Sequence, residues 1–212
     1  TIENTLKSVV AQNLSMFDIL IINDNSTDKT VQIAKKTLKD LNFKRFKIIN
    51  GKKLPPIWSG KVWALKQGVD SAIKKNYKFF LFIDSDIVLK NNIIYNVKNC
   101  LVQNNFMMIS LMAKLNCQTF WEKILIPAFI FFFQKLYPFN AVNNKNFKTA
   151  AAAGGFVFCK AKAFHKQNLF EKIKDKVIDD CNLARLLKKN GNLWLGLTND
   201  VVSKRKYFKL AE

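Results

Sequence analysis

The sequence predicts a single α/β domain in which helices flank a mostly parallel sheet. Short apolar runs rich in β-branched residues alternate with longer helix-compatible segments along the first half of the chain. Of the 212 residues, 49% are hydrophobic, so the chain can bury a sizeable core. The sequence contains neither an internal repeat nor a Pro- and Gly-rich linker, and one domain is therefore expected.

Strands and helices are expected to alternate as far as residue 111. The strands are predicted at residues 18–22, 46–50, 79–83 and 107–111, and the helices at residues 3–12, 27–41, 62–75 and 91–103. Strands joined by helices form βαβ units, whose strands run parallel and are covered on both faces. Ligands of such sheets bind at the carboxyl ends of the strands.

The pattern changes after residue 115. An apolar stretch over residues 120–139 leads to an Asn-rich loop, and a run of alanines precedes Gly154 and Gly155. We expect residues 1–115 and 116–212 to be two halves of one domain. The chain starts without Met at a predicted helix, which indicates an excerpt of a longer protein that lacks at least one opening strand.

The formal net charge is +20, which is typical of proteins that bind nucleic acid or an anionic membrane surface. Only three of the 35 basic residues are arginine, and the lysines are spread along the whole chain. This distribution favours solvated helix faces over a nucleic-acid footprint. A basic nucleic-acid-binding α/β protein stays open as an alternative.

Four cysteines form no C-x-x-C pair, and the chain has a single histidine, so no ligand set for structural zinc is present. We expect Cys100, Cys117, Cys159 and Cys181 to be reduced and buried. Reduced thiols favour the cytoplasm.

Asp84 and Asp86 directly follow the strand at residues 79–83. In an extended chain their side chains would share one face, about 6 to 7 Å apart, and could bind one cation together. Mg²⁺ and Mn²⁺ prefer oxygen ligands, and substrate phosphates commonly complete their shells. The alternative is that both aspartates end the strand and cap the following turn.

Three further segments offer groups for a phosphate or a nucleoside. Asn23 and Asp24 begin a polar loop that can receive hydrogen bonds from a base and a ribose, or can cap the next helix. Lys61 opens a predicted helix, where backbone N–H groups and an ammonium together favour a phosphate. Arg205 lies in a basic segment that suits either phosphate binding or a solvated tail.

Adjacent aspartates mark the start of a helix in the second half. Asp179 and Asp180 precede leucines at helical spacing, and Gly191 is expected to end this helix. One aspartate can be the helix cap, and the second can act as a general base toward a hydroxyl.

The apolar run over residues 124–133 contains Pro127 and is too short to span a bilayer. Its aromatic residues and flanking lysines suit a helix in the membrane interface. A helix buried in the core has the same pattern, so both interpretations stay open.

Taken in order, these motifs resemble those of glycosyltransferase family 2, in the GT-A fold group. They are most similar to the hopene-associated glycosyltransferases of bacterial hopanoid biosynthesis. The resemblance covers nearly the whole chain, through residues 23–30, 58–65, 84–87, 111–113, 121–139, 151–155, 178–185 and 203–207.

The resemblance implies a role for each candidate residue. The donor would be bound by Asn23, Asp24, Lys61, Asp84 and Arg205. Asp84 and Asp86 would hold Mg²⁺ or Mn²⁺, and Asp180, next to Asp179, would be the catalytic base. The acceptor side would include Gly154, Gly155 and Trp121. Asn23 departs from the family pattern, which has an aspartate at this position.

The implied fold is a Rossmann-type GT-A sheet with an apolar helical region on the acceptor side. Residues 1–115 would bind a nucleotide-sugar, with UDP as the expected nucleotide, and residues 116–212 would bind the acceptor and carry the base. The implied enzyme is an inverting, metal-dependent glycosyltransferase that modifies a hydroxyl of a membrane lipid, such as a hopanoid or another isoprenoid.

Such an enzyme is expected at the cytoplasmic face of the bacterial inner membrane, bound peripherally or anchored by segments outside this chain. No nucleic-acid partner is implied. A catalytically inactive, membrane-associated scaffold is a further alternative.

Overall fold

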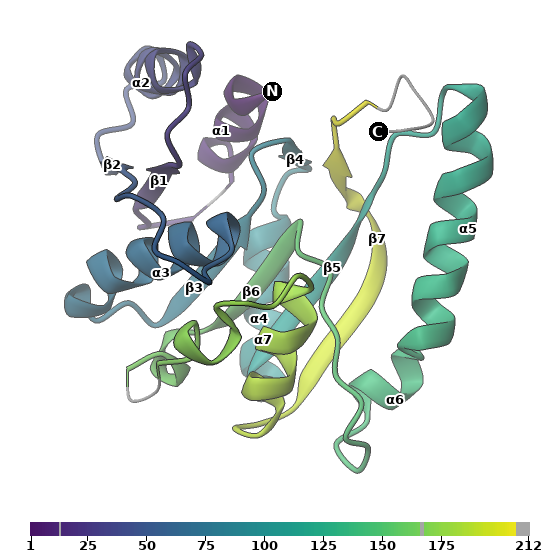
Figure 1. The fold of residues 1–212 in the computed structure, drawn as a ribbon. Coiled ribbons are helices and arrows are strands. Elements are labelled where there is room, and N and C mark those ends of the chain that lie inside the picture. Colours follow the sequence, from purple (N-terminus) through teal and green to yellow (C-terminus); the bar gives the residue numbers. More distant parts are fainter. Residues whose placement is uncertain (13, 166–167, 207–212) are drawn as a thin grey trace.

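The computed structural model describes residues 1–12, 14–165 and 168–206. Two β-sheets are covered by helices on their faces (Figure 1). Tyr207, the last residue of the basic segment noted in the sequence, lies outside the described residues.

The first half contains the predicted elements and one additional short strand. In chain order these elements are α1 (Ile2–Val10), β1 (Ile19–Asn23), α2 (Thr30–Asp40), β2 (Phe46–Asn50), α3 (Gly60–Ala72) with the 3₁₀ turn η1 (Ile73–Lys75), β3 (Phe79–Ile83), β4 (Ile87–Leu89), α4 (Ile93–Gln103) and β5 (Met108–Lys114). The strands and helices predicted before residue 112 are therefore confirmed, and β4 is the element that the sequence analysis did not predict.

The second half adds two strands that complete the larger sheet. Its elements are α5 (Phe120–Leu136), α6 (Phe139–Asn143), β6 (Phe156–Lys160), η2 (Ala161–Ala163), η3 (Glu171–Ile173), α7 (Asp179–Lys188) and β7 (Leu193–Ser203). Since β5 pairs with both β6 and β7, the two halves of the chain share one sheet.

The α/β class is confirmed, but the larger sheet is mixed and not mostly parallel. Its strand order is β3-β6-β5-β7-β4. β6 runs antiparallel to β3 and to β5, and β4 runs antiparallel to β7, whereas β5 and β7 are parallel. The predicted strands β3 and β5 do point the same way. β6 begins at the end of the sheet where β5 finishes, so β6 runs in the direction opposite to β5.

Alternating side chains of the central strands supply two separate cores. Val157 and Cys159 of β6 pack under α3 and α7, together with Leu183 and Leu187 of α7. Phe156 of β6 faces the opposite side, where the apolar residues of α4 cover the sheet. Because both faces of the sheet are covered, its carboxyl edge is left as the place for a ligand.

A smaller unit carries the first polar loop. β1 and β2 form a parallel pair in which Asn23 lies opposite Asn50. Leu6 of α1 and Ala34 and Leu38 of α2 pack together on this pair. The last residues of both strands therefore point their polar side chains toward the same edge.

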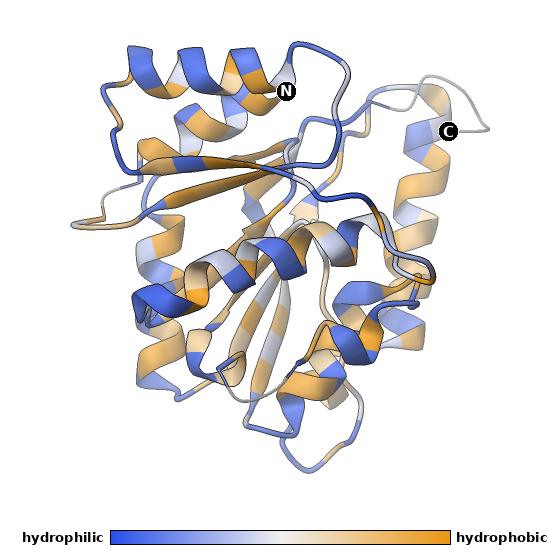
Figure 2. Ribbon diagram, turned by 60° about the vertical axis from the view of Figure 1, so that its left-hand side comes forward, coloured by the Kyte–Doolittle hydropathy of each residue, from blue (hydrophilic) through white to orange (hydrophobic). Residues whose placement is uncertain are grey.

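Helix α5 lies along one edge of the molecule and is orange over most of its length in Figure 2. A capping box formed by Thr119 and Glu122 begins it. Only Glu122 and Ile126 of its residues are buried, so the alternative of a core helix is wrong. No helix within the described parts of the chain has the length and hydropathy that crossing a membrane requires.

The four cysteines are free thiols. Cys159 and Cys181 are buried as predicted, Cys100 is half-buried, and Cys117 is exposed. The prediction of four buried thiols is wrong for Cys117, because it lies in the loop between β5 and α5 and not in either core.

Candidate active site

The candidate site lies at the carboxyl edge of β3, where four segments of the chain meet. A small pocket of about 30 Å³ is bordered by Lys61 of α3, Asp84 at the end of β3 and Gly154 in the loop before β6. Asp179 and Asp180 at the start of α7 complete this border. Its apolar lining consists of Leu65, Phe82, Ile83, Val157 and Leu183. This volume holds one or two water molecules, so a larger ligand would lie over the pocket and not inside it.

Lys61 is placed by the first turn of α3. The Ser59 side chain caps this helix by accepting a hydrogen bond from the backbone N–H of Val62. The Lys61 ammonium lies 3.2 Å from the Asp84 carboxylate. Burial alone would lower the pKa of Lys61, but the charges of Asp84, Asp179 and Asp180 outweigh it and raise the pKa. The ammonium therefore stays charged at the centre of an acidic group.

Asp180 lies in the first turn of α7, and its carboxylate accepts a hydrogen bond of 2.7 Å from the backbone N–H of Cys181. The helix cap is Ile178, so the interpretation that one of the two aspartates is the cap is wrong. Burial raises the pKa of Asp180, and the neighbouring Asp179 charge raises it further, against the lowering effect of Cys181 and Lys61. A raised pKa suits a carboxylate that has to accept a proton.

Gly154 fits between Lys61 and Asp180 because it has no side chain. A Cβ at this position would lie 2.9 Å from the Lys61 ammonium nitrogen and 3.1 Å from an Asp180 carboxylate oxygen. Any larger residue would displace one of these groups. The next residue, Gly155, has a backbone carbonyl that accepts a hydrogen bond of 3.3 Å from the N–H of Asp84.

Two residues that the sequence analysis did not select hold the glycine loop in place. The Ser110 hydroxyl of β5 accepts from the N–H of Ala153 at 2.8 Å. The Cys181 thiol donates to the Ala152 carbonyl at 3.5 Å. Burial, and the Asp180 charge after it, raise the pKa of Cys181 to about 11, so this thiol keeps its proton. A serine within an otherwise apolar strand was the available signal for Ser110.

Asp86 faces a different direction from Asp84. Residues 84–87 form a turn closed by a hydrogen bond from the Ile87 N–H to the Asp84 carbonyl, so the extended geometry assumed for the pair is wrong. The buried Asp86 carboxylate accepts a hydrogen bond from Ser203, and Arg205 lies 4.0 Å away. The C-terminal end of β7 therefore brings Arg205 to the acidic turn.

A metal ion that takes part of its coordination shell from the substrate fits this arrangement. No group of three or more His, Cys, Asp or Glu side chains that could hold a metal occurs among residues 1–12, 14–165 and 168–206. Magnesium at phosphate sites is commonly bound by only one or two carboxylates, and substrate phosphates and water supply the other ligands. The Asp84 side chain, which is 35% exposed beside the pocket, has the oxygen chemistry for that role.

The polar loop after β1 lies against the start of α3. The Asn23 side chain donates to Asn50 at 3.2 Å and accepts from the N–H of Ser26 at 3.1 Å. Asp24 is exposed, and a Cβ on Gly60 would lie 3.2 Å from its carboxylate. Asp24 is thus placed next to the helix turn that carries Lys61.

The remaining predicted acceptor-side residues are not together. Gly154 borders the pocket, and Gly155 packs on Ile87 and Ala113, where a Cβ would lie 3.2 Å from Ile87. Trp121 lies on α5, outside the pocket, and its ring packs on Phe120.

Comparison with known families gives one match. The model of Glycosyl transferase family 2 matches residues 1–167, which is most of the chain. The matched part includes Asp24, Lys61, Asp84 and Asp86, whereas Asp180 lies beyond it. Among curated proteins, none matches the chain significantly.

Several solved structures have a similar fold, among them a mannosyltransferase. TarS of S. aureus superposes with a TM-score of 0.63 at 16% identity, over 95% of this chain and 33% of TarS. The mannosyltransferase PcManGT from Pyrobaculum calidifontis, in complex with GDP-Man and Mn²⁺, superposes with a TM-score of 0.62 at 13% identity, over 97% of this chain and 54% of PcManGT.

A third neighbour is glucosyl-3-phosphoglycerate synthase from Mycobacterium tuberculosis, with a TM-score of 0.56 at 13% identity, over 97% of this chain and 69% of that one. At these identities the likeness concerns the fold, and it confirms the predicted GT-A architecture. The chain spans about a third of TarS and about half of the mannosyltransferase.

The charges around Asp180 predict how its pKa responds to substitution. We expect Asp179→Asn to lower the pKa of Asp180, because a neighbouring negative charge is removed. We expect Lys61→Met to raise it, because the cation that stabilises the carboxylate is lost. Carbon-13 NMR titration of the metal-free chain measures both shifts.

The matched control is Asp70→Asn, since this exposed carboxylate pairs with Lys66 on the same helix and does not border the pocket. It should leave the Asp180 titration unchanged. Shifts of the same sign for the Asp179 and Lys61 variants would contradict the placement of Asp180 between these two charges.

Proposed function

We propose that this chain, which belongs to Glycosyl transferase family 2, is a catalytic domain that transfers a sugar from a nucleotide-sugar donor to an acceptor hydroxyl. The observation that carries the proposal is the meeting of Lys61, Asp84 and Asp180 around one pocket at the carboxyl edge of the sheet. This arrangement joins a phosphate-binding cation, a metal-binding carboxylate and a base at one place.

The donor diphosphate is bound near Lys61. The Lys61 ammonium and the N-terminal end of α3, whose first turn carries Lys61, both supply positive charge. Arg205, whose side chain is 61% exposed beside Asp86, can turn its guanidinium toward phosphate oxygens. Asp24, next to the same helix start, and Asn23 would contact the nucleoside.

Asp84 would hold a divalent ion, Mg²⁺ or Mn²⁺. Asp86, which accepts a hydrogen bond from Ser203 and lies 4.0 Å from Arg205, is the second candidate ligand and would have to turn toward the ion. When bound, such an ion neutralises charge on the departing nucleoside diphosphate. Asp84 also pairs with Lys61 in the structure, so this carboxylate is already held next to a cation at the position where the diphosphate is expected.

Asp180 acts as the general base. Its raised pKa brings it closer to neutral pH while leaving it able to accept the proton of an acceptor hydroxyl. Attack by that hydroxyl on the face opposite to the leaving diphosphate inverts the anomeric configuration. Gly154, between Asp180 and Lys61, leaves room for the reacting groups because it has no Cβ.

The donor and acceptor classes follow from chemistry and resemblance. TarS has been solved with UDP and with UDP-GlcNAc, and these complexes support a nucleotide-sugar donor, with UDP as our first choice. We propose a membrane lipid hydroxyl as the acceptor, of the hopanoid or another isoprenoid class, because α5 exposes many large apolar side chains and the sequence motifs resemble those of lipid-modifying family members. The corresponding location is the cytoplasmic face of the bacterial inner membrane.

Nucleotide-sugar binding and turnover test the proposed reaction. We expect one member of a panel of UDP- and GDP-sugars to raise the unfolding temperature in the presence of Mn²⁺ or Mg²⁺, because a ligand of the native state stabilises it. We expect Asp180→Asn to lower the turnover of that donor by about 100- to 10,000-fold while donor binding is retained. Asp70→Asn should behave as the wild type.

Three results would contradict this proposal. Equal turnover by wild type and Asp180→Asn would remove the assigned base. Absence of stabilisation across the whole panel, with salt-sensitive binding to duplex DNA instead, would favour a nucleic-acid-binding protein. Donor binding without any turnover in the wild type would favour an inactive scaffold.

Gly154→Ala tests the spacing between the charged groups. The added methyl displaces the flexible end of Lys61, so we expect an unfolding temperature within a few degrees of wild type and at least about a tenfold loss of kcat/KM for the donor. Gly68→Ala on α3 is the control, since its new methyl would contact only Ile22. Full activity of the Gly154 variant would show that the Lys61 position is not needed.

A further inference from the structure

Helix α5 exposes an unusual amount of apolar surface. It has 17 residues and few charges, and its large apolar side chains are more than a third exposed at eight positions. These residues are Phe120, Trp121, Ile124, Leu125, Phe129, Phe131, Phe132 and Leu136. A helix that is apolar on all sides is normally buried, but none of the residues that the structure describes covers this exposed surface.

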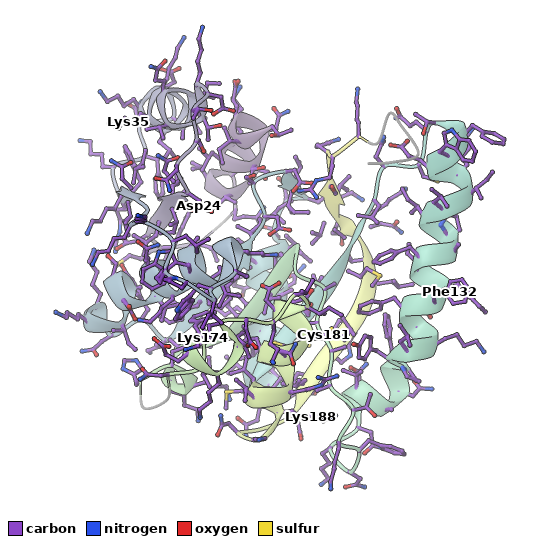
Figure 3. The ribbon with its side chains drawn as sticks, viewed as in Figure 1. Asp24, Lys35, Phe132, Lys174, Cys181 and Lys188 are labelled. Atoms are coloured by element: carbon purple, nitrogen blue, oxygen red, sulfur yellow. The ribbon has the colours of Figure 1, made fainter. Side chains whose placement is uncertain are left out.

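One side of α5 attaches it to the domain. Ile126 is buried, and Phe133 and Tyr137 pack against the cluster that contains Ala151 and Cys181. At 100° per residue, Phe120, Ile124 and Phe131 fall on the opposite side of the helix. Figure 3 shows Phe132 pointing away from the body of the protein, in agreement with its 62% exposure.

The segment of the chain that contains this helix is basic and nearly free of acidic residues. Residues 115–170 contain seven lysines and a single acidic residue, Glu122. Glu122 is only 2% exposed and accepts hydrogen bonds from Asn116 and from the N–H groups of Gln118 and Thr119. Lys135 extends over the ring of Phe131 at 5.4 Å, so a cation accompanies the apolar side.

This charge pattern distinguishes between possible occupants. A second copy of the chain would bring another net charge of +20 and the same lysines against this face, which repel. An anionic bilayer offers negative headgroups to the lysines and an acyl boundary to the aromatic rings. The helix is also shorter than a bilayer span, so it would lie in the plane of the interface.

We propose that α5 docks this domain on an anionic lipid bilayer, with the side that carries Phe120, Ile124, Phe131 and Phe132 inserted at the headgroup boundary. The role of this docking rests on the proposed function: α5 would hold the active site at the membrane surface that contains the lipid acceptor. The anchoring side of α5 packs on Cys181, the residue next to Asp180.

Vesicle binding tests the docking surface. We would measure cosedimentation of the chain with vesicles of 70% phosphatidylcholine and 30% phosphatidylglycerol, and with vesicles of phosphatidylcholine alone. We expect binding to the anionic vesicles, and a partition coefficient at least about tenfold lower for the double variant Phe131→Ser/Phe132→Ser. Binding to the neutral vesicles should be weaker, because the lysines gain nothing there.

The control is Met16→Ser/Val102→Ser, which removes two exposed apolar side chains from other surfaces. It should change the partition coefficient by less than about twofold. Unchanged unfolding temperatures would establish that all variants are folded. Wild-type vesicle binding that does not depend on Phe131 and Phe132, or no binding to anionic vesicles, would overturn the proposal.

Donor turnover in vesicle-free solution separates this inference from the proposed function. If the chain hydrolyses a soluble nucleotide-sugar but does not bind vesicles, the docking proposal fails and the reaction stands. If it binds vesicles through α5 but no nucleotide-sugar is bound or consumed, docking stands and the reaction fails. Self-association that Phe131→Ser/Phe132→Ser abolishes, in the absence of vesicle binding, would instead identify a second copy as the occupant.

Discussion

The ion pair between Lys61 and Asp84 is the interaction on which the candidate site depends. It joins the first turn of α3 to the end of β3. Asp179 and Asp180, at the start of α7, also raise the pKa of Lys61 and keep its ammonium charged. One cation within three carboxylates thus holds in one place the groups that a diphosphate and an incoming hydroxyl would need.

Buried backbone contacts allow these charges to approach each other. Ser110 and Cys181 hold the alanine run, and this run places Gly154 where a side chain would collide with both Lys61 and Asp180. Ser203, at the end of the last strand, fixes the direction of Asp86. Neutral residues of the central strands and of α7 therefore position the backbone segments that carry these charges.

The sequence was informative about local elements and about residue chemistry. Strands β1, β2, β3 and β5 and the helices between them were predictable, since each is a continuous run with one dominant period. β6 and β7 were not predicted, because their neighbours in the sheet are distant in the chain. Asp84 and Asp86 were expected to share one face, which is wrong because a hydrogen-bonded turn replaces the extended geometry.

By itself the sequence determined the α/β class, the family, and the acidic and basic residues available for the reaction, because these depend on local pattern and residue type. Only the tertiary structure decided that Lys61, Asp84 and Asp180 share a pocket while Asp86 faces Arg205. It also decided that α5 lies outside the core. These positions depend on which distant segments pack together, and the hydrophobic period along the chain contains no information about that packing.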